Sequence, residues 1–252
     1  MYRKQLIETW KQEEKEPFSG WDFSHLNGRM IEELPPWSYE KRAAELMRRS
    51  RSLLDMGTGG GEKLFSLQEY WPESVTVTEE YPPNFRLVKE RLEPLGVRVM
   101  DVPLNETTPL PFADGEFDLV INRHSGINSA EVSRILEPGG VFLTKQVHGR
   151  WADDLLAIFE VPLPWENDTP EYYVPLLEAA GMEIRDVQDW KGKFEFTDVG
   201  AIVYYLKAIP WMVPGFSVDT HLDYLFKLEE MLQEDGQLLF TARTFLIEAE
   251  KK

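Results

Sequence analysis

The chain has 252 residues, of which 42% are hydrophobic, and this suits one α/β domain with additions and a packed core. Its formal net charge of −17 argues against a nucleic-acid substrate, because such binding depends on cationic residues. The lack of cysteine excludes cysteine-bound zinc, an iron–sulfur cluster and a cysteine adduct with a pyrimidine. No apolar run is long enough to cross a membrane and no secretory segment opens the sequence, so we expect a cytoplasmic protein.

The first 50 residues are predicted to form an extension before the first strand. A polar helix begins near Met1, and residues 16–24 mix aromatic residues with turn formers. Four arginines near the end of this extension are interpreted as a solvated helix face or as residues favoured by the helix dipole: Arg42, Arg48, Arg49 and Arg51.

A glycine-rich turn follows the first predicted strand. Gly57, Gly59 and Gly61 allow positive φ and a close approach of a ligand to the backbone. In a dinucleotide fingerprint the sixth position of this turn is a third glycine, but here it is Glu62, and together with Asp55 it would repel a diphosphate. A ligand with a cationic end and no phosphate, such as S-adenosylmethionine, suits the turn better.

The second predicted strand ends in an acid. Residues 75–79 alternate β-branched side chains and finish at Glu79, at the edge of the sheet that also carries the glycine turn. A carboxylate there can accept both hydroxyls of a ribose. Glu80 is the alternative, because a slip of one residue exchanges the two faces of a strand.

The first five predicted strands alternate with helical patterns, which predicts a parallel sheet with helices on both faces. The run from Phe117 to Ile121 is largely apolar, as expected of a strand that is buried on both sides. Pro138-Gly139-Gly140 predicts a turn before the fifth strand. The strands are expected near residues 52–56, 75–79, 97–101, 117–122 and 140–146.

The last hundred residues are predicted to contain further helices and two more strands. Helices are expected to begin near Trp151 and at Thr169, where Pro170 suits the first helical position. Gly181 is expected to end the second of these helices. A sixth strand is predicted over 182–187, a helix over 198–206 and a seventh strand over 238–247.

Aromatic and apolar residues are concentrated in an insert at about 190–235. A mostly apolar pocket with a few polar groups is the usual form of a small-molecule site, so we hypothesise that this insert forms the acceptor pocket. Core packing is the alternative interpretation of the same residues: Phe194, Phe196, Tyr204, Tyr205, Trp211, Met212 and Phe216.

Residues 37–150 resemble the class I S-adenosylmethionine-dependent methyltransferase family. The resemblance rests on Glu79 and on four further motifs in the family's order: Asp55–Gly61, Val97–Asp101, Leu110–Val120 and Ile135–Leu143. It implies an α/β, doubly wound, Rossmann-like sheet of seven mostly parallel strands, whose antiparallel last strand lies at the edge. It also implies an N-terminal helical lid over 1–50, a methyltransferase domain over 51–252 and a helical insert before the last strand.

The same resemblance implies a cofactor, S-adenosylmethionine, with S-adenosylhomocysteine as its product. Asp55 and the glycines would hold the methionine portion, Glu79 the ribose and Asp101 the adenine. The predicted cofactor-binding residues are Asp55, Gly57, Thr58, Gly59, Gly61, Glu79, Asp101, Val102 and Asn122. The candidates for the lid and the acceptor pocket are Trp21, Phe23, Trp37, Tyr39, Tyr204 and Trp211.

Methyl transfer from a sulfonium is an in-line displacement, so the enzyme must chiefly align the acceptor, and a base is needed only for a protonated nucleophile. His124 is the first candidate for that base and His148 the second. Arg123 could instead anchor an acceptor carboxylate. No metal site is predicted. Asn122-Arg123-His124-Ser125 stands where an enzyme that methylates the amino group of a nucleobase would carry Asn-Pro-Pro-aromatic.

We therefore expect a methyltransferase that acts on an O, N or C atom of a small-molecule or carrier-linked acceptor. The enzyme alternative is methylation of a tRNA or rRNA base, which would require a basic groove. The alternative that is not an enzyme is a scaffold or regulatory protein that binds the cofactor without turnover. The identity of the acceptor and the oligomeric state stay open, because one fold serves many functions.

Overall fold

The computed structural model describes residues 2–18 and 22–252, and it divides into two compact units. We call one the sheet unit, which consists of Pro36–His148, Asn167–Trp190 and Thr244–Lys252. We call the other the aromatic unit, which consists of the described residues up to Pro35, of Gly149–Glu166 and of Lys191–Arg243. The predicted cofactor-binding residues all fall in the sheet unit.

The sheet unit alternates strands and helices along the chain, as the sequence predicts. Its strands are β2 (Ser52–Met56), β3 (Ser74–Thr78), β4 (Arg98–Met100), β5 (Phe117–Arg123) and β6 (Leu136–Val147). Its helices are α2 (Tyr39–Met47), α3 (Glu62–Ser66), α4 (Pro82–Leu92), α5 (Ser129–Ile135) and α7 (Pro170–Ala179), with short 3-10 turns at Gln68–Tyr70 and Glu93–Leu95. Thr169 caps α7 by accepting from the Tyr172 amide, as its position before Pro170 indicates.

The aromatic unit contains α1 (Tyr2–Glu13), a 3-10 turn (Ser24–Leu26), β1 (Met30–Glu32), α6 (Asp153–Ile158), α8 (Val199–Ala208) and α9 (Leu222–Asp235). Two long strands, β7 (Met182–Phe196) and β8 (Leu238–Lys251), contribute residues to both units. Within the described ranges, no helix combines the length and the apolar character needed to cross a membrane.

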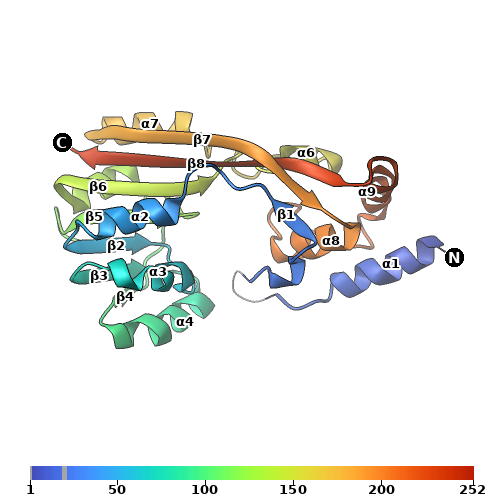
Figure 1. Ribbon diagram of the computed structural model, residues 1–252, viewed down its shortest axis with the longest axis horizontal. Helices are drawn as coiled ribbons and strands as arrows, with labels where there is room; N and C mark the ends of the chain where they lie inside the picture. Colours follow the sequence, from blue (N-terminus) through green and yellow to red (C-terminus); the bar gives the residue numbers. More distant parts are fainter. Residues whose placement is uncertain (1, 19–21) are drawn as a thin grey trace. The chain divides into compact units, whose positions relative to one another are not determined.

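The strands form one sheet in the order β1-β7-β8-β6-β5-β2-β3-β4 (Figure 1). The neighbours from β6 to β4 pair in parallel, whereas β8 pairs antiparallel with β6. The predicted doubly wound, mostly parallel sheet with an antiparallel last strand is therefore confirmed. The strand order reverses between β2 and β5, and in such folds ligands bind outside the carboxyl ends of the strands at this point.

The two faces of β2 explain why it is central. Leu53 and Leu54 are both fully buried, but they pack into different apolar clusters. Leu54 shares a cluster with Val120 and Phe142, and Leu53 shares the other with Leu119. Since successive residues of a strand point to opposite faces, β2 is covered on both sides, as a parallel core strand should be.

Several features of the sheet differ from the prediction. It has eight strands rather than seven, because Met30–Glu32 pairs antiparallel with the end of β7. The last strand, β8, lies between β6 and β7 rather than at the edge. The sixth strand runs to Phe196 instead of ending near residue 187, and all of its residues from 183 to 193 are exposed or half-buried. A strand without a regular buried face has no apolar alternation by which the sequence could mark its length.

Two local predictions also need correction. Pro138-Gly139-Gly140 lies within β6 rather than before it, and the pairing with β5 shifts between Phe117 and Leu119. Arg42 is not part of a solvated face. Its guanidinium donates to both carboxylate oxygens of Glu248, at 2.6 Å each, and so ties α2 to β8.

The aromatic unit is held by rings that pack on one another. Phe194 and Phe196 are fully buried, and Trp151 stacks on Phe194 with ring centroids 5.1 Å apart. Trp151 Nε1 donates to the Tyr205 hydroxyl at 3.0 Å. For Phe194, Phe196 and Tyr205, core packing therefore describes the structure better than the lining of an acceptor pocket.

Candidate functional site

The glycine turn follows β2 at the point where the strand order reverses. Gly57, Gly59 and Gly61 have φ values of 71°, 65° and 78°, which L-residues with a side chain rarely adopt. A Cβ on Gly57 would also collide with the side chain of Ser125, which follows β5. Both the conformation of the turn and its closeness to the loop after β5 therefore require glycine at this position.

The backbone amides of the turn are used within the protein. Gly57 donates to Thr78 Oγ1 at 3.1 Å, and Thr58 donates to the Thr78 carbonyl at 3.0 Å. Gly59 donates to Glu79 Oε2 at 2.8 Å. A phosphate cradle needs backbone amides that point at the ligand, and these three point at protein oxygens instead.

Glu79 faces the turn and Glu80 faces solvent. Glu79 is 7% exposed, and its second carboxylate oxygen accepts from the Tyr81 amide at 2.8 Å. An ionised carboxylate has about four acceptor positions, so two positions remain for donors of a ligand. The geometry therefore favours Glu79 over Glu80 as the acid that meets a ribose.

Asp55 is the other acid of the turn. It is 7% exposed, and burial raises its pKa to about 6, with the nearby Glu79 adding to the effect while Thr58 and Arg123 oppose it. Burial makes the ionised form of this carboxylate costly, and a cationic partner would stabilise that form. An ammonium group of a ligand would supply that partner.

Asp101, which is predicted to meet the adenine, and Val102, another predicted cofactor-binding residue, both follow β4 but differ in burial. Asp101 is exposed, whereas Val102 is 3% exposed and packs in an apolar cluster. Asn122, at the end of β5, is fully buried: its side chain donates to the Met56 carbonyl at 3.3 Å and accepts from Thr144 Oγ1 at 3.0 Å. The Asn122 side chain is thus used to join strands, and the fully buried residue offers no exposed surface to a ligand.

Cations surround the residues after β5. Arg123 and Lys145 are registered neighbours on the parallel strands β5 and β6. His124 has a φ of 55°, its amide donates to the Lys145 carbonyl at 3.0 Å, and its side chain is exposed. Crowding by protein atoms and the positive charges of Arg123, Lys145 and Lys63 hold the pKa of His124 well below its ordinary value. Because solvent still reaches the ring, we attribute the lowered pKa of His124 mainly to the three neighbouring cations and less to burial.

The other catalytic candidate, His148, lies in the core. It is 3% exposed, and its ring meets Phe245 edge-on at 6.1 Å between centroids. This packing suits a structural role better than proton transfer.

The candidates for the lid and the acceptor pocket are divided between the two units. Tyr39 and Trp37 belong to the sheet unit: Tyr39 is 5% exposed, and Lys145 Nζ lies 5.9 Å from the centre of the Trp37 ring. Phe23, Tyr204 and Trp211 belong to the aromatic unit, where Trp211 is 40% exposed. Trp21 lies outside the described residues.

A small hollow of about 160 Å³ opens in the aromatic unit. Tyr204 is among its lining residues, and Phe18, Lys207 and two glutamates form the rest of its charged and aromatic wall. Neither Phe23 nor Trp211 lines this hollow.

Four residues shape the site in addition to those predicted from the sequence. Thr78 accepts from the glycine turn, Ser125 packs against Gly57, and Lys63 and Lys145 act on His124. The signal for Thr78 was its place at the end of a strand, directly before Glu79. The other three depend on contacts between segments far apart in the chain, which local patterns do not reveal.

Comparison with known proteins agrees with this geometry. Residues 54–144 match the family model of a methyltransferase domain. Demethylmenaquinone methyltransferase of Thermus thermophilus is 30% identical over 112 residues, which are 40% of this chain and 50% of that protein. The chain thus matches about half the length of this curated relative.

Solved structures extend the agreement to most of the chain. A protein of Bacillus halodurans aligns with a TM-score of 0.59 at 18% identity, over 84% of this chain and 96% of its own. A SAM-dependent methyltransferase of Aquifex aeolicus aligns with a TM-score of 0.51 at 15% identity, over 98% of each chain. At such identities the likeness concerns the fold. Together with the family match over residues 54–144, it supports a class I methyltransferase fold for this chain.

Proposed function

We propose that the protein is an S-adenosylmethionine-dependent methyltransferase that acts on a small-molecule or carrier-linked acceptor. The observation that carries this proposal is the character of the glycine turn. The amides of Gly57, Thr58 and Gly59 donate to oxygens of the protein itself. Two buried carboxylates, those of Asp55 and Glu79, lie beside the turn. Such a turn suits a cation and a ribose better than a diphosphate.

Each part of the proposed cofactor meets a fitting group. Asp55 would hold the ammonium of the methionine portion, because that cation relieves the buried charge. Glu79 would accept from the ribose hydroxyls with the oxygen positions that its own backbone contacts leave free. Asp101 and the backbone at Val102 would meet the adenine. When bound, the cofactor supplies an electrophilic methyl group on a sulfonium.

The residues after β5 would serve the acceptor. The low pKa of His124 leaves its ring neutral near pH 7, so it can accept a proton from a nucleophile. Among the described residues, no carboxylate forms an ion pair with Arg123, which is half-buried. We assign Arg123 to a carboxylate or phosphate of the acceptor, with Tyr39, Phe23, Tyr204 and Trp211 kept as candidates for the lid and the acceptor pocket.

Calorimetric titration with S-adenosylhomocysteine, run beside NAD, tests the proposal. We expect micromolar binding of S-adenosylhomocysteine and none of NAD. Release of S-adenosylhomocysteine from S-adenosylmethionine is then followed across pairs of acids and their amides, with Arg123→Gln as the variant. Turnover that prefers acids in the native protein but not in the variant supports the role of Arg123. Binding without turnover of any pair would favour a scaffold.

A further inference from the structure

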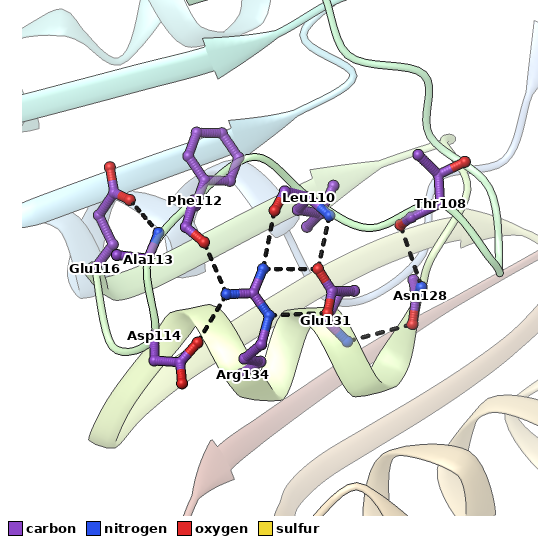
Figure 2. Close-up of polar contacts among 9 residues, drawn as sticks. All are labelled: Thr108, Leu110, Phe112, Ala113, Asp114, Glu116, Asn128, Glu131 and Arg134. Atoms are coloured by element: carbon purple, nitrogen blue, oxygen red, sulfur yellow. Dashed lines mark hydrogen bonds and ion pairs between the residues drawn. The ribbon is translucent and has the colours of Figure 1, made fainter.

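The connection between β4 and β5 is held from one side by helix α5 (Figure 2). Arg134 Nη1 donates to the Phe112 carbonyl at 2.7 Å and to Asp114 Oδ1 at 2.9 Å. Its Nη2 donates to the Leu110 carbonyl at 2.9 Å and to Glu131 Oε2 at 2.7 Å, and its Nε donates to Glu131 Oε1 at 2.8 Å. All three guanidinium nitrogens are therefore engaged, and two of them hold backbone carbonyls of the loop.

The same helix also binds the loop through its other polar groups. Glu131 accepts from the Leu110 amide at 2.6 Å, and the Gly115 amide donates to the Arg134 carbonyl at 3.0 Å. Asn128 caps α5 by accepting from the Glu131 amide at 3.2 Å, and it donates to the Thr108 carbonyl at 3.3 Å. We call Asn128, Glu131 and Arg134 the α5 clamp; Figure 2 shows all three turned toward the loop.

The part of the loop that precedes the clamp packs on the glycine turn. A Cβ on Gly57 would lie 3.3 Å from Leu104 Cδ1, so the Leu104 side chain rests against the turn. A Cβ on Gly126 would lie 2.5 Å from the Leu104 carbonyl, which shows how closely the loop also approaches the segment after β5. Leu104 thus connects the clamped loop with the first glycine of the site.

Buried side chains make this connection continuous. Val102, Leu110 and Phe112 are 3%, 5% and 6% exposed and share one apolar cluster, against which Leu104 packs. Since packed interiors transmit displacements, a shift of the loop at Leu110 or Phe112 moves Val102 and Leu104 as well.

We propose that Arg134 is a positioning residue that shapes the nucleobase side of the cofactor pocket through this loop. The inference rests on the proposed function, because it takes Asp101 and Val102 to meet the adenine. Lysine cannot replace Arg134 here, since a single ammonium lacks the planar fork that serves two carbonyls and two carboxylates at once. The hydrogen bonds of the clamp involve none of the residues predicted to bind the cofactor.

Coupling between two sites is reciprocal, so a positioning role of Arg134 can be distinguished from a purely structural one. If the clamp shapes the pocket, filling the pocket must in turn stabilise the clamp. Hydrogen exchange of the native protein, with and without saturating S-adenosylhomocysteine, measures this effect. We expect slower exchange at the amides of Leu110 and Gly115, with the amides of α7 as the control that does not change. Unchanged exchange at both loop amides would overturn the proposal.

The variant Arg134→Lys tests the pocket itself. S-adenosylhomocysteine is compared with S-inosylhomocysteine, which carries a carbonyl in place of the adenine amino group. We expect the variant to bind S-adenosylhomocysteine about tenfold more weakly, which corresponds to the loss of roughly one charge-assisted hydrogen bond. We also expect it to lose most of the native preference for adenine. Arg185→Lys is the matched control, because Arg185 also pairs with two carboxylates but lies on β7.

The outcomes separate the two proposals. A native preference for adenine that survives in a folded Arg134→Lys variant overturns the role of Arg134 and leaves the proposed function standing. Failure of the native protein to bind S-adenosylhomocysteine rejects both. If Arg134→Lys does not fold, Asp114→Asn replaces it: the Asp114 side chain is 84% exposed, and the variant removes only one partner of the guanidinium. The same loss of adenine preference, in smaller degree, is then expected, and a preserved preference overturns the role.

Discussion

The glycine turn and the aromatic unit are the two regions that the sequence marks as functional. They differ in whether burial is favourable for their key side chains. At the turn, Asp55 is buried although burial opposes its charge. In the aromatic unit, Phe194 and Phe196 are fully buried against other rings, where burial stabilises them. A side chain whose burial costs free energy indicates a role in binding a ligand. A side chain whose burial lowers the free energy of the fold indicates a role in stability.

The largest effect is expected from the core of the aromatic unit. Phe194→Ala should lower the free energy of unfolding by about 3–5 kcal/mol, because it leaves a cavity among packed rings. Urea denaturation measures the loss, and Trp211→Ala, at a side chain that is 40% exposed, is the control with a much smaller effect. Normal stability of Phe194→Ala together with lost turnover would place the ring in a substrate pocket and not in the core.

His124→Asn tests the candidate base that follows β5. Asparagine tolerates the positive φ of this residue, so the variant removes the imidazole without straining the backbone. If His124 is the base, turnover should fall by about 10²–10⁴-fold while the affinity for S-adenosylhomocysteine stays the same. Because the pKa of His124 is lowered, the native acid limb of the pH–rate profile should lie below pH ~6.5 and vanish in the variant. A loss of cofactor affinity instead would assign the ring a structural role.

Asp55→Asn should raise the free energy of unfolding and lower the affinity for the cofactor. The folded-state pKa of Asp55, about 6, lies above that of an unfolded aspartate, so the native carboxylate opposes folding as it ionises. This penalty is absent below about pH 4, grows up to about pH 6 and reaches at most about 3 kcal/mol. Denaturation of both proteins at acid and neutral pH measures it: the variant should be the more stable one at neutral pH only. A variant that is less stable at neutral pH would mean that Asp55 is held for structure.

Glu79→Ala should have the smallest effect of the four. The loss of a charged acceptor for the ribose predicts an affinity for S-adenosylhomocysteine that is weaker by about 1.5–3 kcal/mol, or about 10- to 150-fold. Part of this loss arises because the Gly59 and Tyr81 amides lose their acceptor. Calorimetry measures it, with Glu80→Ala as the control that should bind normally. An equal loss in both variants would show that neither acid alone meets the ribose.

Much of the sheet unit could be predicted because its signals are local. The apolar strands, the turn glycines and the cap at Thr169 act within a few residues of one another, and the structure places them as expected. The predictions that differ from the structure concern β1, the length of β7 and the place of β8. These features depend on which distant strands pair, and an exposed or very short strand leaves little pattern in the chain.

The glycine turn and the order of the motifs can be predicted from the chain alone, since glycine spacing and strand periodicity are properties of neighbouring residues. That Glu79 and not Glu80 faces the turn depends on the fold as a whole, because pairing across strands sets which face each side chain takes. The tertiary structure also raises the pKa of Asp55, lowers that of His124, and places Arg134 against a loop that begins more than twenty residues before it. Burial and the approach of charges from distant segments fix these properties, and no local pattern contains them.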